Sequence, residues 1–297
     1  MDVALHDTAP TMAVALASLL SKEGFKVIPP KSLSRDQLDA FVVGLIDGDG
    51  SLQVNHWRRK YLQFRLVVKL AFKPYNYEML QKIAKVYGGN VRVTTEKRSG
   101  KKTVLWVIDD SNIIRNVIVP LLKKYTPLTT RVQLQLAFVI KALNGMSLEE
   151  FFTSRKSKYS TRGYSTEVLP QVSHTRMPSY FASWLGGFIE AEGCFSVRKA
   201  KNVISFSISQ LHDLALVEGM LAFFGQESSG CNLTIQTKVL KSGHTLYEIS
   251  IGSLAGISSV IKHCKPLLQG YKYVQLAQFV DKVAALRDLH SLFWKKR

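Results

Sequence analysis

"GLIDGDGSL" at residues 44–52 has the same pattern as "GFIEAEGCF" at residues 187–195. Each stretch contains a glycine, two apolar residues, an acid, a small residue, a second acid and a glycine. The second acids of the two stretches, Asp49 and Glu192, stand 143 residues apart. An offset of 142 then pairs "FRL" at 64–66 with "FSI" at 206–208, and "VQL" at 132–134 with "VQL" at 274–276. A nearly constant offset over such a span indicates an internal duplication, and two repeats of this length are two domains.

Both halves show the same succession of periodic patterns. In "YLQFRLVVKL" at 61–70, apolar and polar residues alternate as in a strand with one buried face. In the first half we expect helices at 34–48, 75–87, 111–122 and 129–143, with Ser34 as the first N-cap, and strands at 51–56, 61–72, 90–95 and 103–108. In the second half we expect helices at 178–191, 211–224, 253–263 and 270–288 and strands at 194–199, 203–210, 231–239 and 245–251. The predicted fold class is α+β: two pseudo-twofold-related αββαββα domains, each a four-stranded antiparallel saddle-shaped sheet with helices on one face.

The domain boundaries follow from composition. Residues 1–32 are expected to be an N-terminal extension ended by Pro29 and Pro30, whose apolar stretch fits neither a secretory signal nor an arginine-rich transit peptide. The first domain is placed at 33–143 and the second at 178–297. Residues 144–177 are expected to be a basic linker that also lies along phosphates, because 154–176 holds five Lys or Arg and one Glu among many Ser and Thr.

The charge balance points to a polyanionic partner. The 297 residues carry 40 Lys and Arg against 22 Asp and Glu, a formal net charge of +18. This favours nucleic acid ahead of an anionic membrane, and no apolar run reaches the length of a membrane span. The three cysteines form no C-x-x-C pair, so neither a disulfide framework nor a structural zinc site is expected.

Small residues in the repeated motif predict close helix packing. Gly44 and Gly48 lie on one face of the first predicted helix, and Gly187 and Ala191 do so in the second copy. Small residues at this spacing let two helix backbones approach. We therefore expect these two helices to form the interface between the domains.

Each of these helices ends in acids, which is unusual, because a carboxylate at a helix C-terminus faces the negative end of the dipole. Two such ends in one interface also repel each other. The arrangement is explained if a divalent cation lies between Asp49 and Glu192, with Mg²⁺ expected and Ca²⁺ or Mn²⁺ able to occupy the same sites. Positions 47 and 49 point in different directions, so Asp47 and Glu190 are expected to form local hydrogen bonds instead.

At the level of whole motifs, "VVGLIDGDG" (42–50) and "LGGFIEAEG" (185–193) resemble the two signatures of the LAGLIDADG homing endonucleases in their single-chain form. The likeness covers residues 33–290. It implies a monomer whose sheets lie in the major groove of double-stranded DNA. It also implies that Asp49 and Glu192, helped by the carbonyls of Gly48 and Ala191, bind the metal ions, and that water attacks one phosphate per strand to leave 3′ overhangs.

The resemblance implies two further features. The family places a lysine before the last long helix, which here is Lys123 or Lys124 in the first half and Lys265 in the second. Such proteins are often encoded in introns of mitochondria or other organelles, which implies that localisation here.

The strand alternation also predicts which side chains face DNA. Ser51, Gln53, Asn55, Gln63, Arg65, Lys69, Arg92 and Thr94 are the candidates in the first half. Ser196, Arg198, Ser205, Ser207, Ser209, Thr234, Gln236 and Lys238 are the candidates in the second half. Such side chains read base edges directly or through water. Because the two sets differ, we expect an asymmetric target.

Two alternatives compete with a site-specific DNA endonuclease. An intron RNA-binding maturase on the same fold would need the same basic surface, and the sequence does not separate it from the nuclease. A catalytically silent DNA-binding regulator is disfavoured because both motifs keep their acids.

Overall fold

The structure, a computed structural model, describes residues 30–160, 177–198, 203–226 and 234–287. The first half runs through α2 (Arg35–Asp49), β1 (Gly50–Trp57), β2 (Tyr61–Ala71), α3 (Pro74–Tyr87), β3 (Asn90–Thr95), β4 (Lys102–Ile108), α4 (Ser111–Ile113), the π-helix η1 (Ile114–Ile118), α5 (Val119–Lys124) and α6 (Thr130–Leu143). The second half runs through α8 (Phe181–Glu192), β5 (Cys194–Arg198), β6 (Val203–Leu211), α9 (Leu214–Gln226), β7 (Ile235–Val239), β8 (Thr245–Ile251), α10 (Leu254–Leu267) and α11 (Tyr271–Arg287). Between them lie α7 (Leu148–Ser154) and the short 3₁₀ helix η2 (Ser157–Tyr159).

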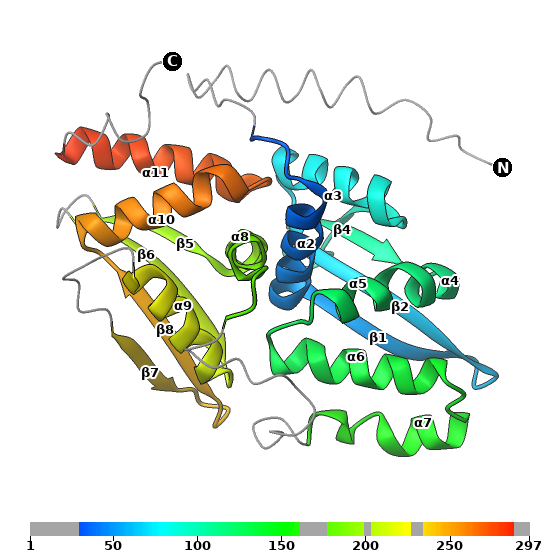
Figure 1. The fold of residues 1–297 in the computed structure, drawn as a ribbon. Helices are drawn as coiled ribbons and strands as arrows, with labels where there is room; N and C mark the ends of the chain where they lie inside the picture. Colours follow the sequence, from blue (N-terminus) through cyan, green and yellow to red (C-terminus); the bar gives the residue numbers. More distant parts are fainter. Residues whose placement is uncertain (1–29, 161–176, 199–202, 227–233, 288–297) are drawn as a thin grey trace.

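The two halves have the same topology. Their sheets have the strand orders β1-β2-β4-β3 and β5-β6-β8-β7, and every pairing is antiparallel. In Figure 1, α2 and α8 lie side by side at the centre, with one sheet on each side of the pair. The predicted α+β class and the duplicated αββαββα order are therefore confirmed.

Strand alternation determines which face of each sheet is buried. In the first sheet the apolar residues that alternate with the predicted DNA-facing ones are all buried: Leu52, Val54, Phe64, Leu66 and Val68. In β6, Phe206 and Ile208 are buried likewise, whereas Phe195 and Val197 of the edge strand β5 are only half-buried. The Phe195 ring still faces inward, with its centroid 5.2 Å from that of Phe206.

The central helix α2 begins at the predicted N-cap. The Ser34 hydroxyl accepts a hydrogen bond from the Gln37 amide at 3.3 Å, and the Gln37 side chain accepts one from the Ser34 amide at 3.0 Å. This reciprocal pair is a capping box, which satisfies two backbone donors that no helical carbonyl can reach.

Two local expectations differ from the structure. The predicted linker at 144–177 contains the helix α7, capped by the Ser147 hydroxyl, which accepts from the Glu150 amide at 3.0 Å. The remainder, at 161–176, lies outside the described residues, as do the extension at 1–29 and the predicted strand start at 231–233. The single helix expected at 111–122 is interrupted by a π-turn just before Pro120, because proline has no N–H for a regular helical bond.

None of the helices in the described parts of the chain is both long enough and apolar enough to cross a bilayer.

Candidate active site

The two motif helices cross in reciprocal close contact. A Cβ placed on Gly44 would lie 1.9 Å from the Trp184 carbonyl oxygen, and one placed on Gly187 would lie 1.8 Å from the Phe41 carbonyl oxygen. Gly44 and Phe41 correspond to Gly187 and Trp184 in the repeat, so the two contacts are related by the pseudo-twofold axis. Only glycine permits this separation of the backbones.

One turn further on, the helices still touch as they end. A Cβ on Gly48 would lie 2.3 Å from the Ala191 Cβ and 3.4 Å from the Glu192 Cγ. The tip carboxylates, Asp49 and Glu192, therefore meet at the same end of the interface, where the surrounding protein partly desolvates them although both residues still reach solvent. Neither helix has a basic residue in its last turn.

The penultimate acids have a different role. Asp47 is buried, and its carboxylate accepts from the amides of Leu128 (2.7 Å) and Thr129 (3.2 Å), the Thr129 hydroxyl and the Trp184 indole. Desolvation raises the pKa of Asp47 to about 6, against these hydrogen bonds.

Glu190 is its counterpart in the second half. Its buried carboxylate accepts from the amides of Gln269 and Gly270, each at 3.1 Å, and from that of Lys272 at 2.9 Å. Both acids are hydrogen-bonded, but not locally as expected: the backbone amides that they accept from lie about 80 residues away, and Trp184 belongs to the other half. Each penultimate acid thus fixes the turn that starts the last helix of its own half.

These turns bring two cations to the site. Arg131 is the second residue of α6, and Lys272 is the second residue of α11. The guanidinium of Arg131 donates to the carbonyls of Asp47 (2.6 Å), Gly48 (2.9 Å) and Gly50 (2.5 Å). A cation at these carbonyls offsets the negative end of the α2 dipole.

The electrostatics of the tip carboxylates reflect this arrangement. Burial and then the charge of Glu192 raise the pKa of Asp49 to about 7, and Arg131 and Lys272 oppose the shift. Burial raises the pKa of Glu192, and the same two cations oppose it. Two acids and two cations, one of each from either half, therefore form one electrostatic cluster.

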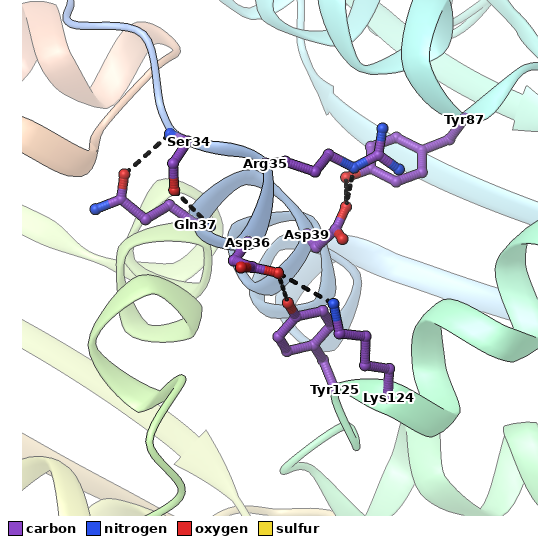
Figure 2. Close-up of polar contacts among 8 residues, drawn as sticks. All are labelled: Ser34, Arg35, Asp36, Gln37, Asp39, Tyr87, Lys124 and Tyr125. Atoms are coloured by element: carbon purple, nitrogen blue, oxygen red, sulfur yellow. Dashed lines mark hydrogen bonds and ion pairs between the residues drawn. The ribbon is translucent and has the colours of Figure 1, made fainter.

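The structure does not bring the expected lysines to this cluster. The Lys124 ammonium lies 3.0 Å from the Asp36 carboxylate in the first turn of α2, where Tyr125 also donates to Asp36 (Figure 2). Asp36 and Asp49 are at opposite ends of the helix, about 20 Å apart at 1.5 Å per residue. Lys123 is exposed on the last turn of α5, and Lys265 is exposed on that of α10.

Arg131 and Lys272, which sequence reasoning missed, are the cations that act on the tip carboxylates, and Lys124 and Lys265 are not among them. A signal for Arg131 and Lys272 was present: both lie in the first turn of the helices that carry the matched "VQL" triplets.

The predicted DNA-facing residues of the paired strands alternate with buried ones, so they lie on the face of each sheet away from the core. Among the described residues, those exposed to solvent are Asn55, Gln63, Lys69, Arg92, Thr94, Arg198, Thr234, Gln236 and Lys238. Those half-buried are Ser51, Gln53, Arg65, Ser196, Ser205, Ser207 and Ser209. The two outward faces are polar throughout these positions, and the sets of residues differ between the halves.

Comparison with known proteins places this site in a family. The model of the "LAGLIDADG endonuclease" family matches residues 42–142. "Probable intron-encoded endonuclease aI3" of Dictyostelium citrinum is 34% identical over 222 residues, which cover 75% of this chain and 86% of that protein. The protein of the same name from Debaryomyces hansenii is 34% identical over 279 residues, covering 82% of this chain and 38% of that longer protein. "Uncharacterized mitochondrial protein RF1" of Saccharomyces cerevisiae is 27% identical over 71% of this chain and 44% of its own length.

Solved structures share the fold. Meganuclease I-SmaMI bound to uncleaveable DNA superposes with a TM-score of 0.62 at 19% identity, over 86% of this chain and 92% of that one. I-SmaMI bound to uncleaved DNA in the presence of calcium ions gives a TM-score of 0.60 at 18% identity, over 88% and 94% of the two chains. The doubled motif, the matched topology and the Dictyostelium relative agree, and the chain belongs to the LAGLIDADG endonuclease family in its single-chain, two-motif form.

Proposed function

We propose that this chain is a monomeric, site-specific endonuclease that cuts a long asymmetric DNA duplex by Mg²⁺-dependent phosphodiester hydrolysis and leaves 3′ overhangs. The observation that carries the proposal is the convergence of Asp49 and Glu192 at the end of the pseudo-twofold interface. A twofold arrangement of acids matches the two antiparallel strands of a duplex, with one phosphate for each half.

The donor set at the helix tips suits a hard divalent cation. Asp49 and Glu192 offer solvent-accessible carboxylates, and within the described ranges no three His, Cys, Asp or Glu side chains gather to hold a metal by themselves. Two carboxylates completed by water and phosphate oxygens are typical of Mg²⁺. When bound, such an ion lowers the pKa of water and offsets negative charge on the phosphate.

The protein's own residues would divide the remaining work. Asp49 and Glu192 would hold the ion, with help from the carbonyls of Gly48 and Ala191. Arg131 and Lys272 would stabilise the charge that develops on the phosphate, since fixed donors in a preorganised site need no rearrangement during reaction. Arg131 would also fix the position of the Gly48 carbonyl, to which it donates a hydrogen bond of 2.9 Å.

The sheets would supply specificity. Their outward faces present Arg, Gln, Asn and Ser in different order on the two halves, which supports an asymmetric target read in the major groove. The relatives are named as intron-encoded endonucleases, which favours DNA cleavage over intron-RNA binding and an intron of a mitochondrion or other organelle as the location of the gene.

The test is cleavage selection. Purified protein is incubated with a randomised duplex library with and without Mg²⁺, and cut ends are sequenced. We expect one asymmetric site family, cut only with metal. Asp49→Asn and Glu192→Gln should bind the recovered duplex but fail to cut it, whereas Asp36→Asn, at the other end of the same helix, should cut normally. Binding without metal-dependent cutting by the wild-type protein would overturn the proposal.

A further inference from the structure

The last helix of each half carries, in its first turn, the cation of the site. Arg131 follows Thr130 at the start of α6, and Lys272 follows Tyr271 at the start of α11. A side chain moves with the backbone that bears it, so the contacts that fix these helix starts also fix the two cations. Asp47 and Glu190 supply part of that fixation from within each half.

The rest of the fixation crosses the domain interface. Asp213 of the second half accepts a hydrogen bond from the Thr130 amide at 3.2 Å and from the Thr130 hydroxyl at 2.6 Å. Reciprocally, the Asn76 side chain of the first half accepts a hydrogen bond from the Tyr271 amide at 2.8 Å. Each half therefore caps the final helix of the other, where backbone donors have no helical partner.

Asp213 and Asn76 come from the same region of their halves, between the end of the second strand and the first turn of the helix that follows. Asp213 directly precedes α9, and Asn76 lies in the first turn of α3. Asp213 also accepts from the Gln210 amide group of β6 at 3.2 Å, and Asn76 donates to the carbonyl of Ala71, the last residue of β2, at 3.0 Å. The caps thus link the second strand of one sheet to the final helix of the other half.

The packing around these caps leaves little freedom. A Cβ on Gly270 would lie 2.6 Å from a Glu190 carboxylate oxygen and 2.8 Å from the Asn76 amide oxygen. The acid of one half and the amide of the other therefore enclose one backbone position. Asn76 is 8% exposed and Asp213 is 7% exposed, so water competes little for these bonds. The Lys73 ammonium also lies 4.9 Å from the centre of the Tyr271 ring.

We propose that Asp213 and Asn76 are positioning residues, through which each half sets the place of the other half's cation beside the tip carboxylates. Asp213 acts through Thr130 on Arg131, and Asn76 acts through Tyr271 on Lys272. This deepens the proposed function and rests on it. The site therefore depends on the register of the two halves.

The test compares Asp213→Ala and Asn76→Ala with Asp213→Asn and Asn76→Asp, which keep an acceptor oxygen. The substrate is a duplex recovered by wild-type cleavage, labelled on each strand in turn and cut in a single turnover. We expect the two alanine variants to slow opposite strands by about tenfold or more, since a misplacement of 1 Å is costly in a preorganised site. Duplex affinity measured without cleaving metal should stay within about twofold, as for contacts remote from the DNA face. The acceptor-keeping variants should recover most of the rate.

A matched control separates positioning from general stability. Asp110 caps α4: its carboxylate accepts a hydrogen bond of 2.7 Å from the Asn112 amide. The Asp110→Ala variant removes this cap, which does not lie at the domain interface. It should leave the ratio of the two strand rates unchanged. Equal slowing of both strands by Asp213→Ala and Asn76→Ala, or no slowing, would overturn the proposal.

Amide hydrogen exchange supplies a readout that needs no cleavage. The Thr130 amide should exchange at least about tenfold faster in Asp213→Ala, and the Tyr271 amide in Asn76→Ala, because each loses its acceptor. Unchanged exchange would overturn the capping itself. If the wild-type protein cuts no duplex, the proposed function fails, and the exchange result still decides whether the reciprocal caps hold these helices.

Discussion

Gly44 packs against Trp184 so closely that a Cβ at position 44 would lie 1.9 Å from the Trp184 carbonyl oxygen. The neighbour is backbone of the other half, so it cannot rotate away as a flexible side chain could. The distance between the two halves is therefore set by the absence of a side chain, and the placement of the tip acids depends on it.

The first prediction concerns this contact. Gly44→Ala should force the helices apart and lower the free energy of unfolding by about 3 kcal/mol or more, the upper range for overpacking a core. Denaturant titration measures this. The control is Gly225→Ala in α9, where an added Cβ meets no atom within 4 Å. It should be neutral or stabilising by about 0.5–1 kcal/mol, because alanine favours helix. Equal effects at the two sites would contradict the packing argument.

The second prediction concerns the cations. Arg131→Ala and Lys272→Ala should each lower the single-turnover cleavage rate by about 10²-fold, the usual cost of one preorganised charge donor. Lys124→Ala and Lys265→Ala should change it little, since neither is among the cations that act on the tip acids. Arg131→Lys should not restore the wild-type rate, because an ammonium cannot reproduce the fork of bonds to three carbonyls. If Lys124→Ala and Lys265→Ala cut slowly while Arg131→Ala and Lys272→Ala cut at the wild-type rate, the two lysines would be the cations of the site.

The third prediction concerns metal binding and pH. Burial and the charge of Glu192 raise the pKa of Asp49 to about 7 in the metal-free protein, so a metal ion must displace a proton there below that pH. Calcium affinity measured by calorimetry should weaken as the pH falls from 8 to 6, by about tenfold per unit below the pKa. Glu192→Gln removes the repelling charge and should move the onset of this loss to lower pH. A flat affinity across the range would show that Asp49 does not bind the ion.

The fourth prediction concerns a half-buried histidine. His263 packs with its ring centroid 5.0 Å from that of Phe223 and 5.7 Å from that of Phe224, and desolvation lowers its pKa to about 4. The unfolded chain binds the proton more readily, so His263 contributes stability fully above about pH 6.5 and loses it as the pH falls towards 4.

His263→Phe should remove this pH dependence. The free energy of unfolding of the wild type, minus that of the variant, should therefore fall by on the order of 2–3 kcal/mol between pH 7 and pH 4. The measurement is denaturant unfolding at several pH values. His244→Phe, at an exposed position, serves as the control. An unchanged difference across the range would mean that His263 is not held neutral in the folded state.

Much of the fold could be predicted from the sequence because its strongest signals are local or repeated. Alternation defines one face of β2, and Ser34 with Gln37 forms the capping box that begins α2. The 143-residue offset between Asp49 and Glu192 indicated the duplication, and the small residues of the two motifs predicted the helix interface between the domains.

The rest depends on long-range geometry. The role of Arg131 follows from its bonds to carbonyls more than 80 residues earlier in the chain, and the caps by Asp213 and Asn76 cross between domains. No periodicity records such contacts. The helix α7 is different, since Ser147 followed by Glu150 is a local start signal that the linker composition concealed.

Whether the tip carboxylates bind the metal is best decided by a crystal structure of the protein bound to its selected duplex with Mn²⁺, located by anomalous scattering. Metal binding by Asp49 and Glu192 predicts ion density within about 2.2 Å of a carboxylate oxygen of each residue and in contact with the scissile phosphates, as expected for hard oxygen ligands. Ions bound elsewhere on the protein, with both tip carboxylates free of metal and distant from the phosphates, would contradict it.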